Sequence, residues 1–422
     1  MKVKLAGSQS LNGAVTVSGA KNSATRVLAA ALLSSGCVNL RNFPLALEDA
    51  KAKINFMQEL GAKIKINEPQ SELELSVPTL SFDGIKDFSL PIRTTYLLAA
   101  GALARNGHAK VPYPGGCKIG SRGYDLHMMV WRQLGCAVDE CPEYIDVRGR
   151  LTGGVIDFPI STVGGTENAL MCASVASGET LIRNAYVTPE ISDLIAFLRE
   201  MGAHIVQEGS SHIRVQGSGG LLRGASFSIM PDRIEALTWI ILGAVTGGNL
   251  LVHNVPFETM EVPLIHLRDA GIDLFRNSST VMVSPDCIGP HGIQPFELAT
   301  GTHPGVISDM QSFFAFLGFF ANGRSVVFDY RYPERIAYAH ELEKFAPGAI
   351  VAEPGKITVQ GPNRLHGAKA KSTDLRGSMA QIMAAICAEG ESQVDGVELA
   401  LRGYNNLPEK LASLGVSAQW SD

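Results

Sequence analysis

Apolar positions along the chain follow two recurring helical patterns. One pattern, as in VLAAALLSSG from Val27, is apolar on every side, which is typical of a helix enclosed by other elements. The other, as in LEDAKAKINFMQELGA from Leu47, places apolar residues at helical spacing on one face and should turn its other face to solvent. Short alternating runs such as AKIKI and LELSV lie between them and predict strands. This alternation of helices and strands is typical of an α/β protein.

These elements recur as copies of one unit. A polar or charged residue begins the enclosed helix of each copy, and these residues are Lys21, Arg93, Glu167, Arg233, Asp309 and Arg376. A glycine before a strand keeps the same interval, at Gly61, Gly135, Gly202, Gly271, Gly348 and Gly415. Two markers that stay in step at intervals of about 70 residues indicate six copies. Six copies divide most simply into two domains of three.

The helix starts are candidate anion sites. The N-terminus of a helix carries unpaired N–H groups and the positive end of the helix dipole. A cation there opposes the dipole unless an anion neutralises it, and four starts carry one: Lys21, Arg93, Arg233 and Arg376. If these starts converge, they form an anion-binding cage. The acidic residues near the helix starts are what helix capping or the helix dipole predicts by itself, and these are Glu167, Asp232, Glu235 and Asp309.

Composition excludes several classes of protein. The chain has 422 residues, of which 45% are hydrophobic and 18% charged, as in a compact enzyme. Its net charge of −5 provides no general attraction for nucleic acid. The longest apolar run, TWIILGAVTGG, is too short to cross a bilayer, and the N-terminus lacks an apolar segment of signal-peptide length. We therefore expect no nucleic-acid or membrane partner.

Cysteine and histidine usage predicts neither disulfides nor a metal. The seven cysteines are odd in number and contain no CxxC pair, which favours reduced thiols and a cytoplasmic location. The ten histidines contain no HExxH motif, and the chain has no GxxxxGK[ST] phosphate loop. We expect no metal and no cofactor.

Two glycine-rich segments carry candidate chemistry. In the loop VPYPGGCKIGSRGYD, Cys117 is flanked by Lys118 and Arg122, and nearby cations lower the pKa of a thiol. Cys117 is therefore a candidate thiolate or general acid, although a buried inert thiol remains the alternative. The segment TVGGT at 162–166 precedes the third enclosed helix and offers backbone N–H groups that suit a phosphate, although a plain turn fits equally well.

Eight motifs together resemble one family over essentially the whole chain. They are SGAKNSA (18–24), PGGCKIGSRGYDLH (114–127), TVGGTEN (162–168), PDRIEA (231–236), SDMQ (308–311), YPER (332–335), DLRGS (374–378) and RGYNNLPEKLASLG (402–415). The chain resembles the UDP-N-acetylglucosamine 1-carboxyvinyltransferases, which are enolpyruvyl transferases of peptidoglycan synthesis. The resemblance implies a two-domain inside-out α/β barrel of six βαβαββ repeats, three in each domain. Residues 1–20 with 231–422 would form one domain and residues 21–230 the other, which carries the Cys117 loop, with the active site in the cleft between them.

The resemblance also implies roles for individual residues. Phosphoenolpyruvate would be held by Lys21, Arg122, Arg335 and Arg376, with Arg93 supporting the cleft. Cys117 would protonate C3 of phosphoenolpyruvate, and Asp309 would take the proton of the acceptor's 3-hydroxyl, whose sugar Asn22 helps to hold. The nucleotide would lie against Thr162, Val163 and Gly164, with Arg122, Asp125 and Leu126 on the uracil side.

Departures from the family's pattern gather on the acceptor side. The chain has Lys118 where the family has Ala, Gly123 for Pro, Ile160 for Lys, Thr188 for Glu, and Ile336-Ala337-Tyr338 for FMH. The residues of the chemistry are retained, so the acceptor is either UDP-N-acetylglucosamine or another uridine nucleotide or nucleoside. A non-catalytic binding protein is the third hypothesis, and it leaves the joint presence of Cys117, Asp309, Lys21 and Arg376 without a reason.

Overall fold

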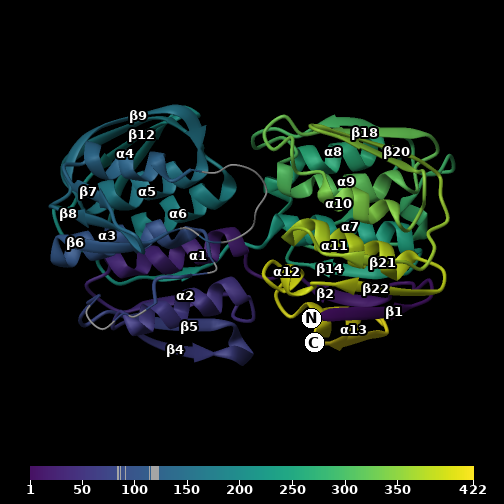
Figure 1. Cartoon of the computed structure of the whole chain (residues 1–422), viewed down its shortest axis with the longest axis horizontal. Helices are drawn as coiled ribbons and strands as arrows, with labels where there is room; N and C mark the ends of the chain where they lie inside the picture. Colours follow the sequence, from purple (N-terminus) through teal and green to yellow (C-terminus); the bar gives the residue numbers. More distant parts are fainter. Residues whose placement is uncertain (83–84, 86, 91, 114, 116–122) are drawn as a thin grey trace. The chain divides into compact units, whose positions relative to one another are not determined.

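The computed structural model describes residues 1–422 apart from 83, 84, 86, 91, 114 and 116–122. These residues form two compact units (Figure 1). The terminal unit contains both chain ends and consists of Met1–Ser18 and Pro231–Asp422. The inner unit consists of the described residues between Gly19 and Met230.

The sheets of the terminal unit share one plan. A central strand pairs in parallel with an edge strand on one side and antiparallel with another strand on the other. The strand orders are β21 (Lys369–Lys371)–β22 (Glu391–Asp395)–β1 (Lys2–Ala6)–β23 (Ala418–Ser421), β15 (Phe275–Arg276)–β16 (Val281–Val283)–β14 (Leu250–His253)–β2 (Gly13–Thr16), and β17 (Glu297–Ala299)–β18 (Arg324–Phe328)–β20 (Lys356–Gln360)–β19 (Ile350–Glu353).

Two of the three sheets of the inner unit repeat this plan, and the third consists of antiparallel pairs among the described residues. Those two sheets have four strands, and the third has three strands among the described residues. The orders are β13 (Ser226–Ser228)–β3 (Val38–Arg41)–β5 (Glu72–Ser76)–β4 (Lys63–Asn67), β11 (His204–Glu208)–β12 (His212–Gln216)–β10 (Ser177–Ala185)–β9 (Thr152–Thr162), and β6 (His108–Pro112)–β8 (Tyr144–Arg148)–β7 (Ala137–Glu140). The fold class predicted from the repeats is confirmed, with three repeats in each unit.

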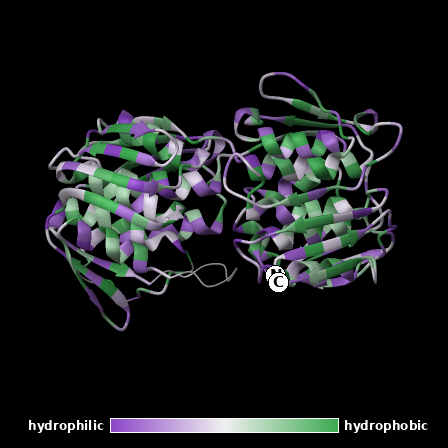
Figure 2. Ribbon diagram, turned by 90° about the horizontal axis from the view of Figure 1, so that it is seen from above, coloured by the Kyte–Doolittle hydropathy of each residue, from purple (hydrophilic) through white to green (hydrophobic). Residues whose placement is uncertain are grey.

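Each repeat contributes one enclosed helix to the core of its unit. These helices are α1 (Lys21–Ala30), α3 (Leu98–Asn106) and α5 (Val163–Val175) in the inner unit, and α7 (Arg233–Thr246), α9 (Gln311–Gly318) and α11 (Leu375–Cys387) in the terminal unit. Figure 2 shows hydrophobic residues concentrated in the interior of each unit. Gly101 lets α3 pack closely against the turn that follows α1. A Cβ on Gly101 would lie 2.4 Å from the Cβ of Leu32 in that turn.

A second set of helices packs outside the enclosed ones. They are α2 (Glu48–Glu59), α4 (Asp125–Gln133) and α6 (Pro189–Glu200) in the inner unit, and α8 (Glu261–Asp269), α10 (Ala337–Glu343), α12 (Glu398–Leu401) and α13 (Leu407–Ser413) in the terminal unit. Helices α2 and α6 bury one face and expose the other, as their amphipathic patterns predict. None of the helices formed by the described residues combines the length and apolar character needed to cross a membrane.

The N-terminal strands complete sheets of the terminal unit. Strand β1 pairs antiparallel with β22 and β23, so Lys2 lies opposite both Asp395 and Ser421. Strand β2 pairs in parallel with β14. The chain therefore begins in the terminal unit, forms the whole inner unit, and then returns to complete the unit in which it began.

Three of the expected helix starts differ in detail. Glu167 lies in the second turn of α5, because that helix begins at Val163. Arg93 precedes a 3-10 turn, η3 (Thr94–Leu97), and α3 follows it. Asp309 lies in the 3-10 turn η6 (Ser308–Met310) that leads into α9. The apolar runs correctly predicted helices α3, α5 and α9. The residue at which each helix begins depends on the geometry of the preceding turn and cap, which the runs do not reveal.

Candidate active site

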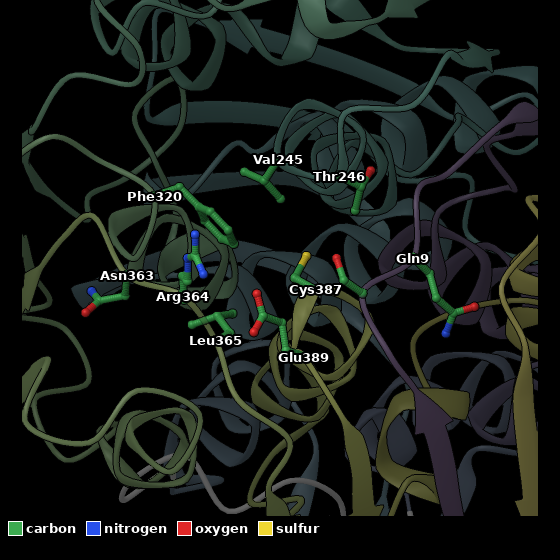
Figure 3. A pocket seen from close by; sticks show the side chains of 10 residues that line it. Gln9, Val245, Thr246, Phe320, Asn363, Arg364, Leu365, Cys387 and Glu389 are labelled. Carbon is green, nitrogen blue, oxygen red and sulfur yellow. The ribbon is translucent and has the colours of Figure 1, made fainter.

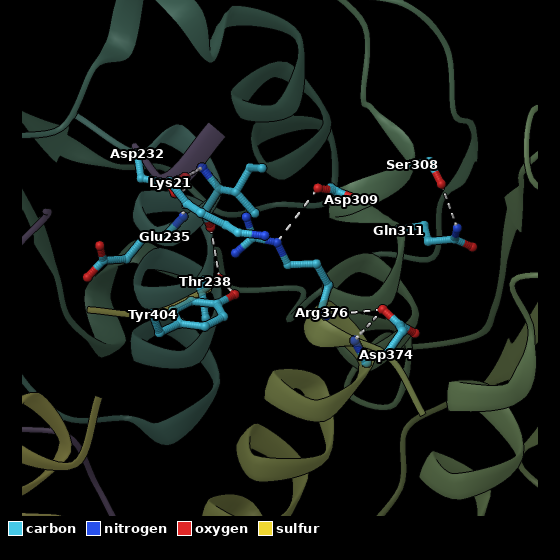
Figure 4. A network of polar contacts seen from close by, with 12 residues as sticks. Lys21, Asp232, Glu235, Thr238, Ser308, Asp309, Gln311, Asp374, Arg376 and Tyr404 are labelled. Carbon is cyan, nitrogen blue, oxygen red and sulfur yellow. Dashed lines mark hydrogen bonds and ion pairs between the residues drawn. The ribbon is translucent and has the colours of Figure 1, made fainter. Parts of the chain in front are cut away.

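An acid–base cluster in the terminal unit brings together three of the predicted site residues. Arg335 Nη1 donates to Asp309 Oδ1 at 2.9 Å, and Arg376 Nε lies 3.8 Å from Asp309 Oδ2. Asp374 joins them, since its Oδ1 accepts from Arg335 Nη2 at 2.7 Å and from the backbone N–H of Arg376 at 3.1 Å. Figure 4 shows Asp309 and Asp374 on either side of Arg376. This cluster of Asp309, Arg335, Asp374 and Arg376 is called the Arg–Asp cluster below.

The two arginines of the Arg–Asp cluster are buried cations with donors to spare. Arg335 is 6% exposed and Arg376 only 1%. Within the described part of the chain, Arg335 Nε and Arg376 Nε and Nη1 are buried without a hydrogen-bond acceptor. Buried N–H groups of charged side chains are nearly always satisfied, so an oxyanion is the ligand that these donors suit.

Both guanidinium groups stay charged despite their burial. Burial lowers the pKa of Arg335, but Asp374 and Asp309 outweigh it and raise the pKa above its usual range. Burial likewise lowers the pKa of Arg376, and Tyr404, Asp232 and Asp309 reverse the shift. The Arg376 guanidinium also lies over the Tyr404 ring, with 5.2 Å between Cζ and the ring centroid.

The carboxylate of Asp329, which sequence reasoning missed, holds the turn that carries Asp309. Asp329 Oδ2 accepts from Ser308 Oγ at 2.5 Å and from Gln311 Nε2 at 2.6 Å. Its Oδ1 accepts from the backbone N–H groups of Arg331 and Tyr332, both at 3.0 Å. The turn before α9 and the loop after β18 are thus held by one side chain, which places Asp309 beside Arg335.

The start of α7 has the acidic cap expected at Asp232. Asp232 accepts from the backbone N–H of Ile234 at 2.8 Å and of Glu235 at 3.2 Å. Burial raises the pKa of Asp232, and Arg376 is the main influence that lowers it. Arg233 follows as the first residue of α7 and is 2% exposed.

In the inner unit, Lys21 begins α1 and pairs with an acid of α2. Its Nζ lies 3.0 Å from Asp49 Oδ2, with the lysine side chain 16% exposed. Asn22 follows in the first turn of α1 and is half-buried. A cation at a helix start is therefore partly balanced here by the Asp49 carboxylate.

Arg93 and the start of α4 lie together in the same unit. Arg93 Nη2 donates to the Gly123 carbonyl oxygen at 3.2 Å, and Asp125 and Leu126 begin α4 two residues later. A Cβ on residue 123 would lie 2.3 Å from Asp125 Oδ1. The Pro that the resemblance implies at this position is thus incompatible with the observed Asp125 rotamer.

The predicted nucleotide segment forms the start of α5 and does not precede it. Thr162 is the N-cap and its hydroxyl accepts from the backbone N–H of Gly165 at 3.3 Å, while Val163 and Gly164 form the first turn. A Cβ on Gly164 would lie 2.8 Å from Tyr96 Oη. The glycine therefore lets this helix start approach Tyr96.

Tyr96 and His127 form a stacked pair beside the start of α5, which sequence reasoning did not anticipate. Their ring centroids are 3.5 Å apart at an interplanar angle of 16°. Burial lowers the pKa of His127 to about 3, and the charge of Arg93 adds to the shift, so the imidazole is neutral. His127 is the last residue of the motif PGGCKIGSRGYDLH. Only the structure shows that its ring stacks on Tyr96 and lies beside Gly164.

Two acceptor-side departures have visible local consequences. Ile160 near the end of β9 is 63% exposed, which is high for a large apolar side chain. Thr188 is the N-cap of α6 and its hydroxyl accepts from the backbone N–H of Ile191 at 3.3 Å. Thr188 thus stabilises its own helix start.

Some predicted residues lie outside the described ranges, namely Cys117, Lys118 and Arg122. Burial raises the pKa of several described cysteine thiols, to about 11 for Cys136 and about 12 for Cys387, and it also raises that of Cys172. These three thiols are therefore protonated at neutral pH. Among the described residues, no three His, Cys, Asp or Glu side chains are grouped to hold a metal ion.

A pocket of about 160 Å³ in the terminal unit contains none of the predicted site residues (Figure 3). It is lined by residues that end α7 and α11, including Thr246 and Cys387, and by Arg364 and Glu389. Helix C-termini are the negative ends of helix dipoles and disfavour an anion. The pocket is thus unlike the N-terminal side of α11, where Arg376 lies.

Comparison with known proteins points to one group of enzymes. A family model described as EPSP synthase (3-phosphoshikimate 1-carboxyvinyltransferase) matches residues 5–411. A UDP-N-acetylglucosamine 1-carboxyvinyltransferase of Zymomonas mobilis is 36% identical over 428 residues, covering 99% of each chain. That of Novosphingobium aromaticivorans is also 36% identical over 428 residues, covering 99% of this chain and 98% of the relative.

Solved structures share the fold at lower identity. The enolpyruvyl transferase NikO of Streptomyces tendae aligns with a TM-score of 0.88 and 23% identity, covering 99% of this chain and 98% of NikO. An EPSP synthase of Acinetobacter baumannii aligns over the whole of both chains with a TM-score of 0.75 and 17% identity.

Proposed function

Since the chain belongs to the 1-carboxyvinyltransferase family, whose members include EPSP synthase and UDP-N-acetylglucosamine 1-carboxyvinyltransferase, we propose that it transfers the enolpyruvyl group of phosphoenolpyruvate to a uridine nucleotide. The first candidate acceptor is the 3-hydroxyl of UDP-N-acetylglucosamine, the substrate in the names of the 36% identical relatives. This product would serve peptidoglycan synthesis.

The proposed reaction proceeds by addition and elimination. The acceptor oxygen bonds to C2 of phosphoenolpyruvate while C3 takes a proton from Cys117, and Asp309 takes the proton of the acceptor hydroxyl. The C2–O bond to phosphate then breaks, and loss of a proton from C3 restores the double bond. Phosphate is released and the enol ether remains on the acceptor.

The observation that carries the proposal is the placement of Asp309 between two buried arginines. Arg335 lies 2.9 Å and Arg376 3.8 Å from its carboxylate, and both arginines keep N–H groups available for an oxyanion. Phosphoenolpyruvate carries a phosphate and a carboxylate, which match such donors. When it occupies them, it competes with Asp309 for both cations, and the carboxylate becomes available to the acceptor.

Lys21 and Arg93 are the proposed anion-binding groups of the inner unit. Lys21 is held by Asp49, and Arg93 by the carbonyl of Gly123. The first turn of α5 provides backbone N–H groups that suit a phosphate. An active site in a cleft between the domains stays a prediction.

Another uridine nucleotide is the second candidate acceptor. Ile160 is exposed and uncharged where the resemblance implies a Lys on the nucleotide side, and Gly123 accommodates an Asp125 rotamer that a side chain would displace. Both features alter the acceptor side and leave the Arg–Asp cluster unchanged.

Phosphate release tests these alternatives. The enzyme is incubated with phosphoenolpyruvate and, in turn, UDP-N-acetylglucosamine, UDP, UMP or uridine, and inorganic phosphate is measured. Turnover fastest with UDP-N-acetylglucosamine supports the first acceptor, and turnover fastest with a smaller nucleotide supports the second. Absence of phosphate release with every acceptor, while phosphoenolpyruvate still binds, would favour the non-catalytic hypothesis.

A further inference from the structure

Lys53 on α2 is a buried lysine that the proposed reaction leaves without a role. Its side chain is 0% exposed, whereas lysine is almost never fully buried unless it is paired. The same helix carries Lys51, which is 51% exposed and pairs with Glu48 at 2.9 Å. Solvation of a surface helix explains Lys51 but not Lys53.

The Lys53 ammonium connects three elements of the inner unit. It donates to the carbonyl of Thr25 in α1 at 2.9 Å, and to the carbonyl and hydroxyl oxygens of Thr94 at 3.1 and 2.5 Å. Thr94 follows Arg93 directly, and the Thr25 hydroxyl donates to the carbonyl of Lys21 at 3.3 Å. One end of the connection therefore reaches the residue next to Arg93, and the other reaches the residue one helical turn after Lys21.

Helix α2 also contacts Lys21 directly, through Asp49. Asp49 lies one turn before Lys53 on the same helix and pairs with Lys21 at 3.0 Å. The two residues are four apart and thus share one face of α2. That face holds Lys21 through a carboxylate and the Arg93–Thr94 segment through an ammonium.

The surroundings of Lys53 are densely charged. Arg26 of α1 pairs with Glu167 of α5, which is 0% exposed, and Glu167 also accepts from Tyr96 Oη of η3 at 3.3 Å. Burial lowers the pKa of Lys53 to about 7, and the charge of Arg26 adds to this shift. Glu167 and Asp49 raise the pKa, and Lys21 lowers it further.

We infer that Lys53 is a positioning residue for Lys21 and Arg93, because its hydrogen bonds join the first turns of α1 to the Arg93–Thr94 segment. The inference rests on the proposed function, in which these two cations are the anion-binding groups of the inner unit. The network also couples anion binding to protonation of the Lys53 amine. An anion that neutralises Lys21 removes a repulsion on Lys53, so anion binding and protonation of Lys53 favour each other.

Deprotonation changes charge more than geometry. A neutral amine still donates two hydrogen bonds, to the carbonyls of Thr25 and Thr94, and can accept one from the Thr94 hydroxyl. The network thus survives above the folded-state pKa, while the positive charge is lost. Anion affinity should fall as pH rises through about 7 and Lys53 loses its proton.

Binding of phosphoenolpyruvate by the whole protein tests the positioning role. Calorimetry with Lys53→Met should show a dissociation constant raised by about tenfold or more, because the Arg93–Thr94 segment loses its anchor. Lys51→Met removes a lysine from the exposed face of the same helix and should bind as the unaltered protein does. Thr94→Val keeps the carbonyl but loses the hydroxyl acceptor, and should shift the constant in the same direction by a smaller factor.

Sulfate tests the coupling, since its charge does not change between pH 6 and pH 9. Its inhibition constant against phosphoenolpyruvate should rise several-fold over this range in the unaltered protein and in Lys51→Met. The rise should be much smaller in Lys53→Met, which has no proton to lose. A merely structural lysine would not change the slope of this profile.

The outcomes separate the inference from the function on which it rests. If the unaltered protein does not bind phosphoenolpyruvate, the proposed function and the inference both fail. If it does, and Lys53→Met and Thr94→Val bind equally tightly with an unchanged sulfate profile, only the inference is overturned. Should Lys53→Met fail to fold, the result with Thr94→Val decides.

Discussion

Asp374 Oδ1 accepts hydrogen bonds both from Arg335 and from the first backbone N–H groups of α11. The same oxygen accepts from Arg335 Nη2 at 2.7 Å and from the backbone N–H groups of Arg376 and Gly377 at 3.1 and 3.2 Å. One carboxylate therefore caps the helix that carries Arg376 and aligns Arg335 beside it. A cation at the start of α11 is tolerated because its cap is an acid.

This double role predicts different costs for two substitutions. Asp374→Asn keeps an oxygen acceptor for the cap but loses the charge that balances Arg335, whereas Asp374→Ala loses both. Loss of a cap costs about 1 kcal/mol, and removal of one partner of a buried ion pair costs about 3–5 kcal/mol. In urea unfolding, the unaltered protein should therefore be the most stable, Asp374→Asn less stable and Asp374→Ala the least stable. As a control, Thr188→Ala removes a cap without an ion pair and should cost only about 1 kcal/mol. Equal stability of the Asn and Ala variants would contradict the double role.

Removal of the Arg376 charge should weaken phosphoenolpyruvate binding and abolish turnover. Arg376→Gln is preferable to Ala because the side chain is 1% exposed and contacts Tyr404, so truncation would leave a cavity. Loss of a charge-assisted contact should cost about 1.5–3 kcal/mol of binding free energy. Lys21→Ala should behave similarly.

The matched control for this charge is Arg364→Gln, which lies in the same unit at the pocket of Figure 3. Calorimetric titration with phosphoenolpyruvate and measurement of phosphate release compare the variants. Activity of Arg376→Gln equal to that of the control would discard the anion-binding role of this helix start.

Cys117 should be the cysteine that electrophiles label fastest. Its loop places Lys118 and Arg122 nearby in sequence, whereas burial raises the pKa of Cys136 and Cys387 to about 11 and 12. Peptide mass spectrometry after brief treatment with fosfomycin or iodoacetamide identifies the labelled residue. Label found mainly on the exposed Cys37 would count against a lowered pKa at Cys117. A Cys117→Asp variant should retain activity if the role is proton donation.

Placing at position 123 the Pro that the resemblance implies should alter acceptor binding. A side chain there would lie within 2.3 Å of Asp125 Oδ1, so Gly123→Pro forces the Asp125 carboxylate to another rotamer. Asp125 is exposed and can move at little cost, so stability should change by less than about 1 kcal/mol. Titrations with UDP-N-acetylglucosamine and UMP, with Gly220→Pro as a surface glycine control, show whether the ratio of the two affinities moves. An unchanged ratio would show that Gly123 does not select the acceptor.

His127 should make the protein less stable in mild acid. Its pKa is about 3 when folded and 6.5 in its ordinary state, so the unfolded chain binds more protons between these values. Stability is therefore fully present above pH 6.5 and is lost as pH falls toward 3, by roughly 2 kcal/mol between pH 6.5 and pH 5. His127→Phe can keep the stack on Tyr96 without a titrating group. Urea unfolding at both pH values should show a smaller loss in this variant, and an equal loss would refute the buried neutral imidazole.

Sequence alone determined the repeat, the fold class and the positions of most helix-start cations. These features depend on local spacing, because an enclosed helix is apolar on all sides wherever it occurs and a turn needs its glycine. Arg233 and Arg376 thus lie at the starts of α7 and α11, as expected. The displacement of Glu167 into the second turn of α5 shows the limit of such patterns, since the preceding TVGG is compatible with both a turn and a helix.

Only the tertiary structure decided which side chains meet. Asp329 and Asp374 look like ordinary loop and cap residues in the sequence, yet packing places one under Asp309 and the other beside Arg335. Lys53 looks like a solvated residue of an amphipathic helix, and its neighbours Arg26 and Glu167 are 27 and 114 positions away in the chain. Contacts over such separations depend on how repeats stack, and local periodicity carries no information about them. The charge and hydrogen bonding of the site therefore follow from the assembled fold.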